Sequence, residues 1–216
     1  MKALLLAVLA AFPVTASANG ARKYINFNIY GHGNNYNVSE PSLRLNLHVN
    51  AYRSNYSFSG QPFSGNISKS GSYFHINGGG LNATVNLWGG NYSVDGTIHD
   101  TMGRPGTLHL SFTLNVIGRT DDPANPPSYS VHDGRSGSSL RLDPTGRGNY
   151  RVSGNVDEEK FGVGGTALVS LVAIVASHSL QNREPAPEVR SEALQAPVSL
   201  PALRGASLPS LPFPLK

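Results

Sequence analysis

Residues 81–100 read LNATVNLWGGNYSVDGTIHD and fold on paper into a β-hairpin. A two-residue turn at Gly89 and Gly90 uses the positive φ angles that glycine tolerates. Trp88 then faces Asn91, and the next pairs separate an apolar face from a face of Asn, Ser and Thr: Leu87 with Tyr92, Val85 with Val94, Ala83 with Gly96 and Leu81 with Ile98. A slip of one residue would exchange the faces of one strand, so this agreement indicates both the hairpin and its register.

The same alternation of apolar and polar residues continues on both sides of the hairpin. Residues 24–30 and 43–51 alternate cleanly and predict strands, while residues 31–42, rich in Gly and Asn, predict a loop. Turns near 52–53, 60–61, 70–71 and 78–79, with a longer loop at 101–105, set Val49 against Tyr56, Phe58 against Phe63, Ile67 against Phe74, Ile76 against Leu81, and Ile98 against Leu108. The sequence therefore predicts an all-β fold, an antiparallel meander of about 8–10 strands that forms an up-and-down barrel or a meander-built sandwich.

A weak internal repeat supports this fold. The segments 55–60 (NYSFSG), 91–96 (NYSVDG) and 149–154 (NYRVSG) share one pattern, and 128–134 (SYSVHDG) is a looser copy. The spacing is irregular, so the repeat indicates a recurring type of strand, and its terminal glycine indicates a bend or bulge.

The pattern changes after residue 156, which ends the predicted β domain at 19–156. Residues 157–180 contain an apolar run in which Thr166, Ser170, Ala173 and Ser177 recur at helical spacing. This spacing favours a short helix packed on the sheet over a strand or a membrane-associated segment. Residues 181–216 are rich in Pro, Ala, Leu and Ser, which predicts a disordered tail.

The first 18 residues have the order of a secretory signal peptide. Lys2 precedes an apolar run at 3–14, and Ala16-Ser17-Ala18 precedes the expected cleavage site. The apolar run is shorter than the roughly 20 residues that span a bilayer. We therefore expect export to the periplasm or the extracellular space. The chain has no cysteine, which excludes disulfides and thiol ligands.

The polar face of the hairpin carries the candidate site. Charged residues make up 14% of the chain, against about 25% in typical domains, and amides, hydroxyls and imidazoles take their place. The candidate ligand-binding residues on this face are Asn82, Thr84, Asn86, Trp88, Thr97, His99 and His109.

Two of these residues form a weak candidate metal pair. In the predicted register His109 faces Thr97, so His99 lies on the diagonal of His109, within roughly 7 Å. Two imidazoles at that separation can share a transition metal. The sequence offers no convincing third ligand, and exposed sheet histidines are the plainer interpretation. No cofactor is expected.

No catalytic motif is present, and the basic residues are scattered, which argues against a nucleic-acid partner. The sequence predicts an exported, non-enzymatic protein with a binding or structural role in the cell envelope or outside it. It does not identify the partner, and a glycan, an envelope component and a small apolar molecule stay open, while association with a membrane is not favoured. One alternative is a soluble barrel that carries a small apolar molecule, lined by Phe58, Phe63, Phe74, Phe112 and Tyr92. The other is a small outer-membrane barrel, although the strands near residues 56 and 67 are short for that role.

Overall fold

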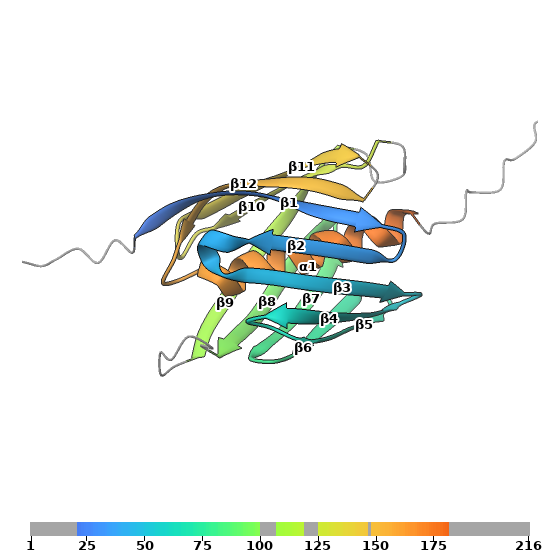
Figure 1. Cartoon of the computed structure of the whole chain (residues 1–216), viewed down its shortest axis with the longest axis horizontal. Coiled ribbons are helices and arrows are strands. Elements are labelled where there is room, and N and C mark those ends of the chain that lie inside the picture. Colours follow the sequence, from blue (N-terminus) through green and yellow to red (C-terminus); the bar gives the residue numbers. More distant parts are fainter. Residues whose placement is uncertain (1–20, 100–106, 119–124, 147, 182–216) are drawn as a thin grey trace, which may run out of the picture. The chain divides into compact units, whose positions relative to one another are not determined.

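The computed structural model describes residues 21–99, 107–118, 125–146 and 148–181. The predicted signal peptide at 1–18 and the Pro-rich tail beyond residue 181 lie outside the described residues. Twelve strands, one 3₁₀ turn and one α-helix make up the described part (Figure 1): β1 (Arg22–His32), β2 (Asn35–Glu40), η1 (Pro41–Leu43), β3 (Leu45–Tyr52), β4 (Asn55–Gln61), β5 (Gly65–Ser70), β6 (Tyr73–Gly78), β7 (Leu81–Trp88), β8 (Asn91–His99), β9 (Thr107–Ile117), β10 (Ser128–Asp133), β11 (Ser138–Gly146), β12 (Asn149–Asp157) and α1 (Gly162–Gln181).

The sheet is a closed up-and-down barrel. Each strand pairs antiparallel with the next, and β1 pairs with β12 to close the circle. The prediction of an all-β antiparallel meander is confirmed, and of the two predicted forms the structure adopts the barrel. The barrel has more strands than the 8–10 expected, and the predicted loop at 31–42 is wrong because it contains β2. Only Tyr36 and Val38 mark the apolar face of β2, which is too few for a clear period.

The register of the central hairpin is confirmed throughout. Trp88 faces Asn91, Val85 faces Val94 and Leu81 faces Ile98. The next pairing is confirmed as well, since β8 and β9 place Ile98 opposite Leu108.

Three other predicted pairings are wrong by two residues. Ile76 faces Ala83, Ile67 faces Ile76 and Val49 faces Phe58. Because side chains alternate with a period of two, these shifts leave every residue on the predicted face. In the β6–β7 hairpin the turn consists of Gly79 and Gly80, both of which have positive φ. The predicted pairing of Phe58 with Phe63 is also wrong, because β5 begins later and Phe58 faces Gly65.

The sequence repeat corresponds to the even-numbered strands. β4, β8, β10 and β12 carry the four segments found in the sequence, and β2 and β6 follow the same pattern. In all six strands the second residue is a buried aromatic and the fourth is a buried apolar residue. The fold therefore consists of six hairpins whose second strands share one design, with aromatic second residues Tyr36, Tyr56, Phe74, Tyr92, Tyr129 and Tyr150.

The terminal glycine of the repeat lies where neighbouring strands approach closely. A Cβ on Gly154 would lie 2.1 Å from the carbonyl oxygen of Ser139, and one on Gly60 would lie 1.9 Å from that of Asn46. Both glycines also have positive φ, at 149° and 154°. A side chain at either position would push the adjacent strand away.

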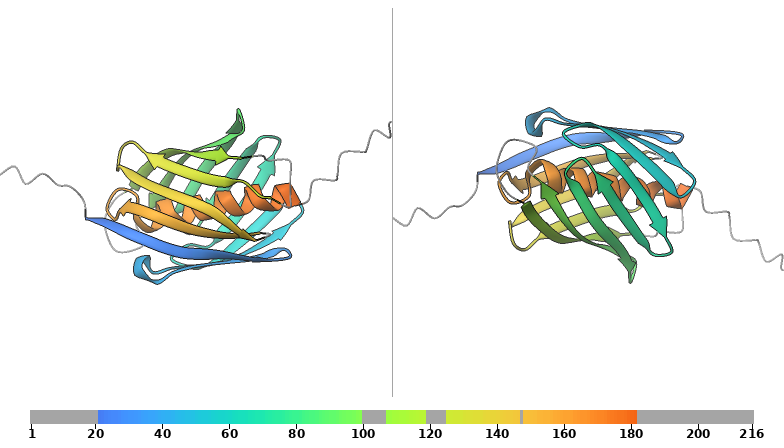
Figure 2. Two further views of the ribbon diagram at one scale, coloured as in Figure 1. Left: turned by 90° about the horizontal axis from the view of Figure 1, so that it is seen from above. Right: turned by 90° about the horizontal axis from the view of Figure 1, so that it is seen from below.

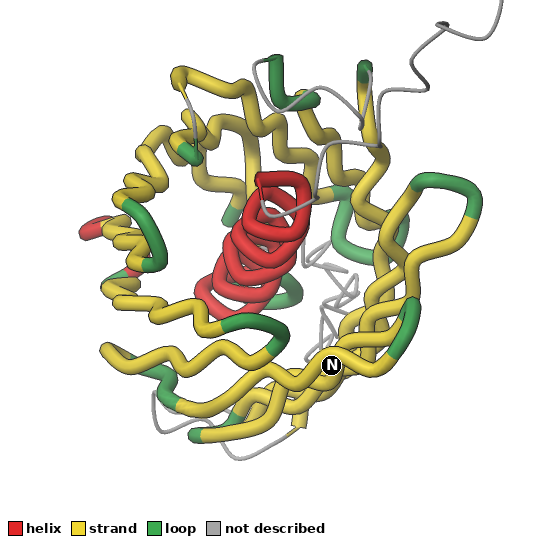
Figure 3. Tube along the Cα trace, turned by 90° about the vertical axis from the view of Figure 1, so that its right-hand side faces the viewer, coloured by secondary structure: helices red, strands yellow, loops and turns green. Residues whose placement is uncertain are grey.

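Helix α1 lies inside the barrel (Figures 2 and 3). The predicted helix is confirmed, and its position is more enclosed than expected, because the sheet surrounds it instead of packing on one side. Residues Thr166–Ser177 are all buried, with at most 2% of any residue exposed. The predicted stripe of small residues is therefore one part of a helix that is buried on every side.

The length and composition of α1 would also suit a membrane span. Residues 162–180 have a mean hydropathy of 1.7, and 89% of this window is buried inside the structure. Two of its hydroxyl groups are satisfied within the helix: Thr166 Oγ1 donates to the carbonyl of Gly162 at 2.8 Å, and Ser170 Oγ donates to that of Thr166 at 2.9 Å. The barrel interior thus explains why this helix is apolar all round.

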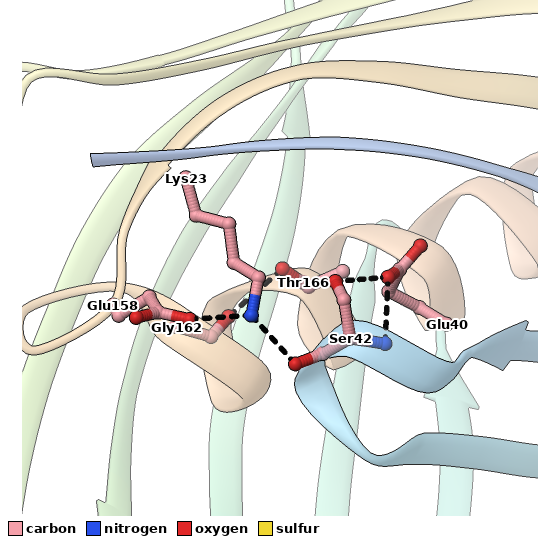
Figure 4. Close-up of polar contacts among 6 residues, drawn as sticks. All are labelled: Lys23, Glu40, Ser42, Glu158, Gly162 and Thr166. Atoms are coloured by element: carbon pink, nitrogen blue, oxygen red, sulfur yellow. Dashed lines mark hydrogen bonds and ion pairs between the residues drawn. The ribbon is translucent and has the colours of Figure 1, made fainter. Parts of the chain in front are cut away.

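Polar contacts tie together the barrel end where α1 begins (Figure 4). Lys23 Nζ of β1 donates to the carbonyl of Ser42 and pairs with Glu158, both at 2.7 Å. The buried carboxylate of Glu40 accepts from the backbone N–H of Ser42 at 3.0 Å and from its hydroxyl. These contacts connect β1, η1 and the turn that leads from β12 into the helix.

We predict that Gly154→Ala lowers the free energy of unfolding by about 1–3 kcal/mol, because its Cβ would overlap the β11 backbone. Gly134→Ala is the matched control, since a Cβ there would meet no atom within 4 Å, and its change should stay within about 0.5 kcal/mol. Urea denaturation measures both variants. Equal losses in the two would contradict the close approach of β11 and β12.

Candidate functional site

The predicted site residues lie together on the outer surface of three neighbouring strands. β7 carries Asn82, Thr84, Asn86 and Trp88, while β8 carries Thr97 and His99 and β9 carries His109. Their side chains are exposed or half-buried, in alternation with buried residues of the interior. The structure adds Tyr73, His75 and Asn77 of β6, which face Asn86, Thr84 and Asn82. We call these ten residues the outer patch.

The outer patch is part of a longer polar row. Strand by strand, from β2 to β9, direct cross-strand partners form a continuous series: Asn35, Asn50, Ser57, Asn66, Asn77, Asn82, Thr97 and His109. Neighbouring strands are about 4.8 Å apart, so amide and hydroxyl groups recur at that interval around the barrel. At one end of the row, Asn50 Nδ2 donates to Asn35 Oδ1 at 2.9 Å.

Charge is sparse on this side of the barrel. Among the outward positions that the structure describes in β2–β9, Asp95 is the one carboxylate, and none is Lys or Arg. Lys69 of β5 alternates with the outward residues but is also exposed, with its Nζ 5.4 Å from the centroid of the Phe74 ring. Outward basic residues occur instead on the other side of the barrel, where Arg141 pairs with Asp143 at 2.9 Å and Arg151 donates to Asn26 at 3.0 Å. The outer patch therefore presents hydrogen-bonding groups with little net charge.

The patch histidines each contact a different partner. Nδ1 of His99 lies 3.0 Å from Thr107 Oγ1, and Nε2 of His109 lies 3.6 Å from Asp95 Oδ2. The register places His99 on the diagonal of His109, as predicted from the central hairpin. Within the described ranges no group of three or more His, Cys, Asp or Glu residues could hold a metal ion, so the pair lacks a third ligand from this part of the chain.

Two aromatic rings flank the amides of the patch. Trp88 is 83% exposed at the end of β7, and Tyr73 is 47% exposed at the start of β6. Tyr73 faces Asn86, so one ring lies directly beside an amide of the patch. Exposure on this scale leaves both rings available for contact with a ligand.

The aromatic residues predicted to line a carrier cavity do face the interior. Phe58, Phe63, Phe74, Phe112 and Tyr92 are all buried. Several of them pack on other rings: the centroids of Phe112 and Phe161 are 5.5 Å apart, and those of Phe74 and Tyr92 are 6.4 Å apart. Helix α1 occupies the interior that these residues surround (Figure 3).

A buried histidine near the end of α1 was not among the site residues predicted from the sequence. His178 is 4% exposed and lies between the rings of Tyr56 and Tyr36, at centroid distances of 5.4 and 6.3 Å. Its Nδ1 lies 3.3 Å from the Tyr56 hydroxyl, and its Nε2 lies 3.4 Å from Asn34 Oδ1. A neutral ring with the proton on Nε2 satisfies both contacts, and burial lowers the pKa of His178.

Comparison of the chain with protein-family models, with curated proteins and with solved structures gives no match. The function is therefore argued from the geometry of the barrel.

The lowered pKa of His178 predicts a loss of stability in acid. Its ordinary value is 6.5, so the unfolded chain takes up this proton at a higher pH than the folded chain. The neutral, buried imidazole of His178 stabilises the fold fully above a pH of about 6.5. This stabilisation is lost as the pH falls through the pKa that His178 has in the folded protein. Each tenfold difference in proton affinity between the two states is worth about 1.4 kcal/mol. Wild-type protein should therefore lose more unfolding free energy than His178→Gln between about pH 7 and pH 5.

The measurement is urea denaturation at a series of pH values. His75→Gln, on the outer patch, controls for the removal of an imidazole. Identical pH dependence in wild type and His178→Gln would show that burial of His178 does not affect its titration.

Proposed function

We propose that this chain is an exported, non-enzymatic β-barrel protein that binds an uncharged glycan through its outer patch. The observation that carries the proposal is the composition of that surface: amides, hydroxyls and two exposed aromatic rings on adjacent strands, with Asp95 as the one neighbouring carboxylate on the described outward positions of β2–β9. The predicted signal peptide supports export.

The chemistry of the outer patch suits a neutral polyhydroxylated ligand. Each Asn side chain can both donate and accept hydrogen bonds, as sugar hydroxyls do. Trp and Tyr provide large, rigid contact areas at a low cost in conformational entropy, and Asn and Ser provide adaptable hydrogen bonds. A surface with little charge offers no strong attraction to anionic ligands, which favours a neutral glycan over an acidic one.

The filled interior supports an outward-facing function. A carrier requires interior space for its ligand, and α1 runs through the interior of this barrel (Figure 2). The rings expected to line a ligand cavity are buried with the helix in one apolar core. The carrier is therefore the weaker alternative.

The polarity of the wall argues against a membrane barrel. A lipid-spanning barrel has an apolar outer band about 25 Å tall. Here the apolar residues of the strands point inward, and Asn, Ser, Thr and His point outward. Such an outer surface would place amides in lipid without partners, which is costly, and it supports a barrel surrounded by water.

A titration of the mature protein with neutral glycans tests the proposal. The full-length chain is expressed, and the exported protein, expected to begin at Asn19, is used for a screen of immobilised neutral and acidic glycans. The chain has one tryptophan, so the fluorescence of Trp88 reports binding of the glycan selected by the screen. Trp88→Ala and Tyr73→Ala should each weaken binding about tenfold or more, equivalent to about 1.4 kcal/mol.

Tyr24→Ala is the matched control, because Tyr24 is 63% exposed but lies on β1, outside the outer patch. It should bind as the wild type does. Failure of every neutral glycan to bind, or unchanged affinity in both patch variants, would refute the proposed function.

A further inference from the structure

Five tyrosines form one layer inside the barrel. Tyr36, Tyr56, Tyr92, Tyr129 and Tyr150, here called the tyrosine layer, are the second residues of β2, β4, β8, β10 and β12. These strands all run in one direction, so their second residues lie near the same end of the barrel. Each of the five is at most 9% exposed. The rings of Tyr129 and Tyr150 are 5.6 Å apart.

The layer surrounds the last turns of α1. Tyr56 contacts His178 of the helix, and Tyr36 meets the same imidazole edge-on. Tyr150 lies beside Ser177 and Tyr129, close enough for both to influence the pKa of its phenol, which burial raises. The layer thus brings phenol, imidazole and hydroxyl groups together in an otherwise apolar interior.

Three hydroxyls of the layer make no hydrogen bond of ordinary geometry within the described part of the chain: the buried phenol oxygens of Tyr36, Tyr129 and Tyr150. Tyr150 lies close enough to Tyr129 and Ser177 for a looser polar contact, whereas Tyr36 has no such neighbour among its described contacts. Burial keeps all three phenols protonated, since it raises the pKa of Tyr36 to about 12 and that of Tyr129 further. Each therefore retains an O–H donor that requires an acceptor.

The hydroxyls are not needed to fill the layer. β6 has Phe74 at the equivalent position, and its ring packs on Tyr92 at 6.4 Å. A ring without a hydroxyl therefore fits, whereas a buried hydroxyl without a partner is costly. Tyrosine at the other five positions indicates that its hydroxyl has a use inside the barrel.

We propose that the tyrosine layer is an internal hydration site, in which ordered water molecules bridge the hydroxyls of Tyr36, Tyr129 and Tyr150 around the end of α1. The occupant is neutral, because no Lys or Arg that could bind an anion is among the buried residues that the structure describes. The buried carboxylates of Glu40, Asp133 and Asp157, which could bind a cation, end β2, β10 and β12 and so lie at the opposite ends of these strands from the tyrosines. It is small, because the helix fills the centre of the barrel (Figure 3). Water satisfies these conditions and both donates and accepts hydrogen bonds.

Substitution of the tyrosines by phenylalanine distinguishes a wet layer from a dry one. If water satisfies the hydroxyls, Tyr36→Phe and Tyr129→Phe each break hydrogen bonds and lower the melting temperature by about 2–4 °C. If the hydroxyls have no partner, the same changes remove a buried unsatisfied group and raise the melting temperature. Tyr56→Phe controls for loss of a known hydrogen bond, and Tyr24→Phe controls for an exposed phenol.

Oxygen-17 relaxation dispersion then counts long-lived water molecules in the wild type and in the Tyr36→Phe, Tyr129→Phe, Tyr150→Phe triple variant. The proposal requires that the triple variant hold fewer long-lived waters than the wild type. If the melting temperatures do not change, this count alone distinguishes a wet layer from a dry one. An unchanged count, a rise in melting temperature in both single variants, or a co-purified organic molecule bound in the native mass spectrum would overturn it. None of these results bears on the outer patch, so the glycan proposal is tested separately.

Discussion

Closure of the sheet around an apolar interior is the constraint on which the rest of this structure depends. Twelve alternating strands turn their apolar residues inward, and a barrel of that size encloses more space than its own side chains fill. Helix α1 occupies this space and contacts wall on every side. It must therefore be apolar all round, and the hydroxyls of Thr166 and Ser170 in its buried middle bond to its own backbone. The filled lumen supplies the stability that a chain without cysteine cannot obtain from disulfides.

The same constraint is the reason that we propose a function for the outer surface of the barrel. With the interior filled, the surface open to a large ligand is the outer wall, where cross-strand pairing brings amides and hydroxyls from distant segments into continuous rows. Asn35 and His109 are far apart in sequence, yet an unbroken series of direct partners joins them. The exposed rings of Tyr73 and Trp88 lie beside the amides of β6 and β7, where they would contact the proposed glycan.

Much of this architecture could be predicted from local pattern. The alternation around Gly89 and Gly90 fixed the face and register of the central hairpin, and the change of pattern after residue 156 predicted the helix. The pairings across neighbouring turns were wrong by two residues, because the pattern repeats every two residues and does not distinguish such shifts. β2 was missed because its apolar face is too short to show a period. Closure could not be predicted, since the pairing of β1 with β12 joins the two ends of the sheet and leaves no local signal.

The candidate site likewise has one part that could be predicted from the sequence and one part that could not. The outer patch follows from strand register, so its seven predicted residues fall on three adjacent strands. The tyrosine layer and His178 depend on the position of α1 inside the closed barrel, which no local pattern specifies. The repeated Asn-Tyr segments were a signal for that layer, because each marks the start of an even-numbered strand and places its tyrosine inward. The significance of the repeat is apparent only when the strands are assembled.

The central claim is that α1 is enclosed by the barrel in the native protein, and thiol labelling tests it most directly. The chain has no cysteine, so a single cysteine can be placed at Ser170, which is fully buried in α1, or at Ser93, which is exposed on the outer wall. Ser93→Cys should react rapidly with a maleimide, whereas Ser170→Cys should react only at a rate limited by unfolding. Reaction of Ser170→Cys as fast as Ser93→Cys under native conditions would show that the helix is not enclosed.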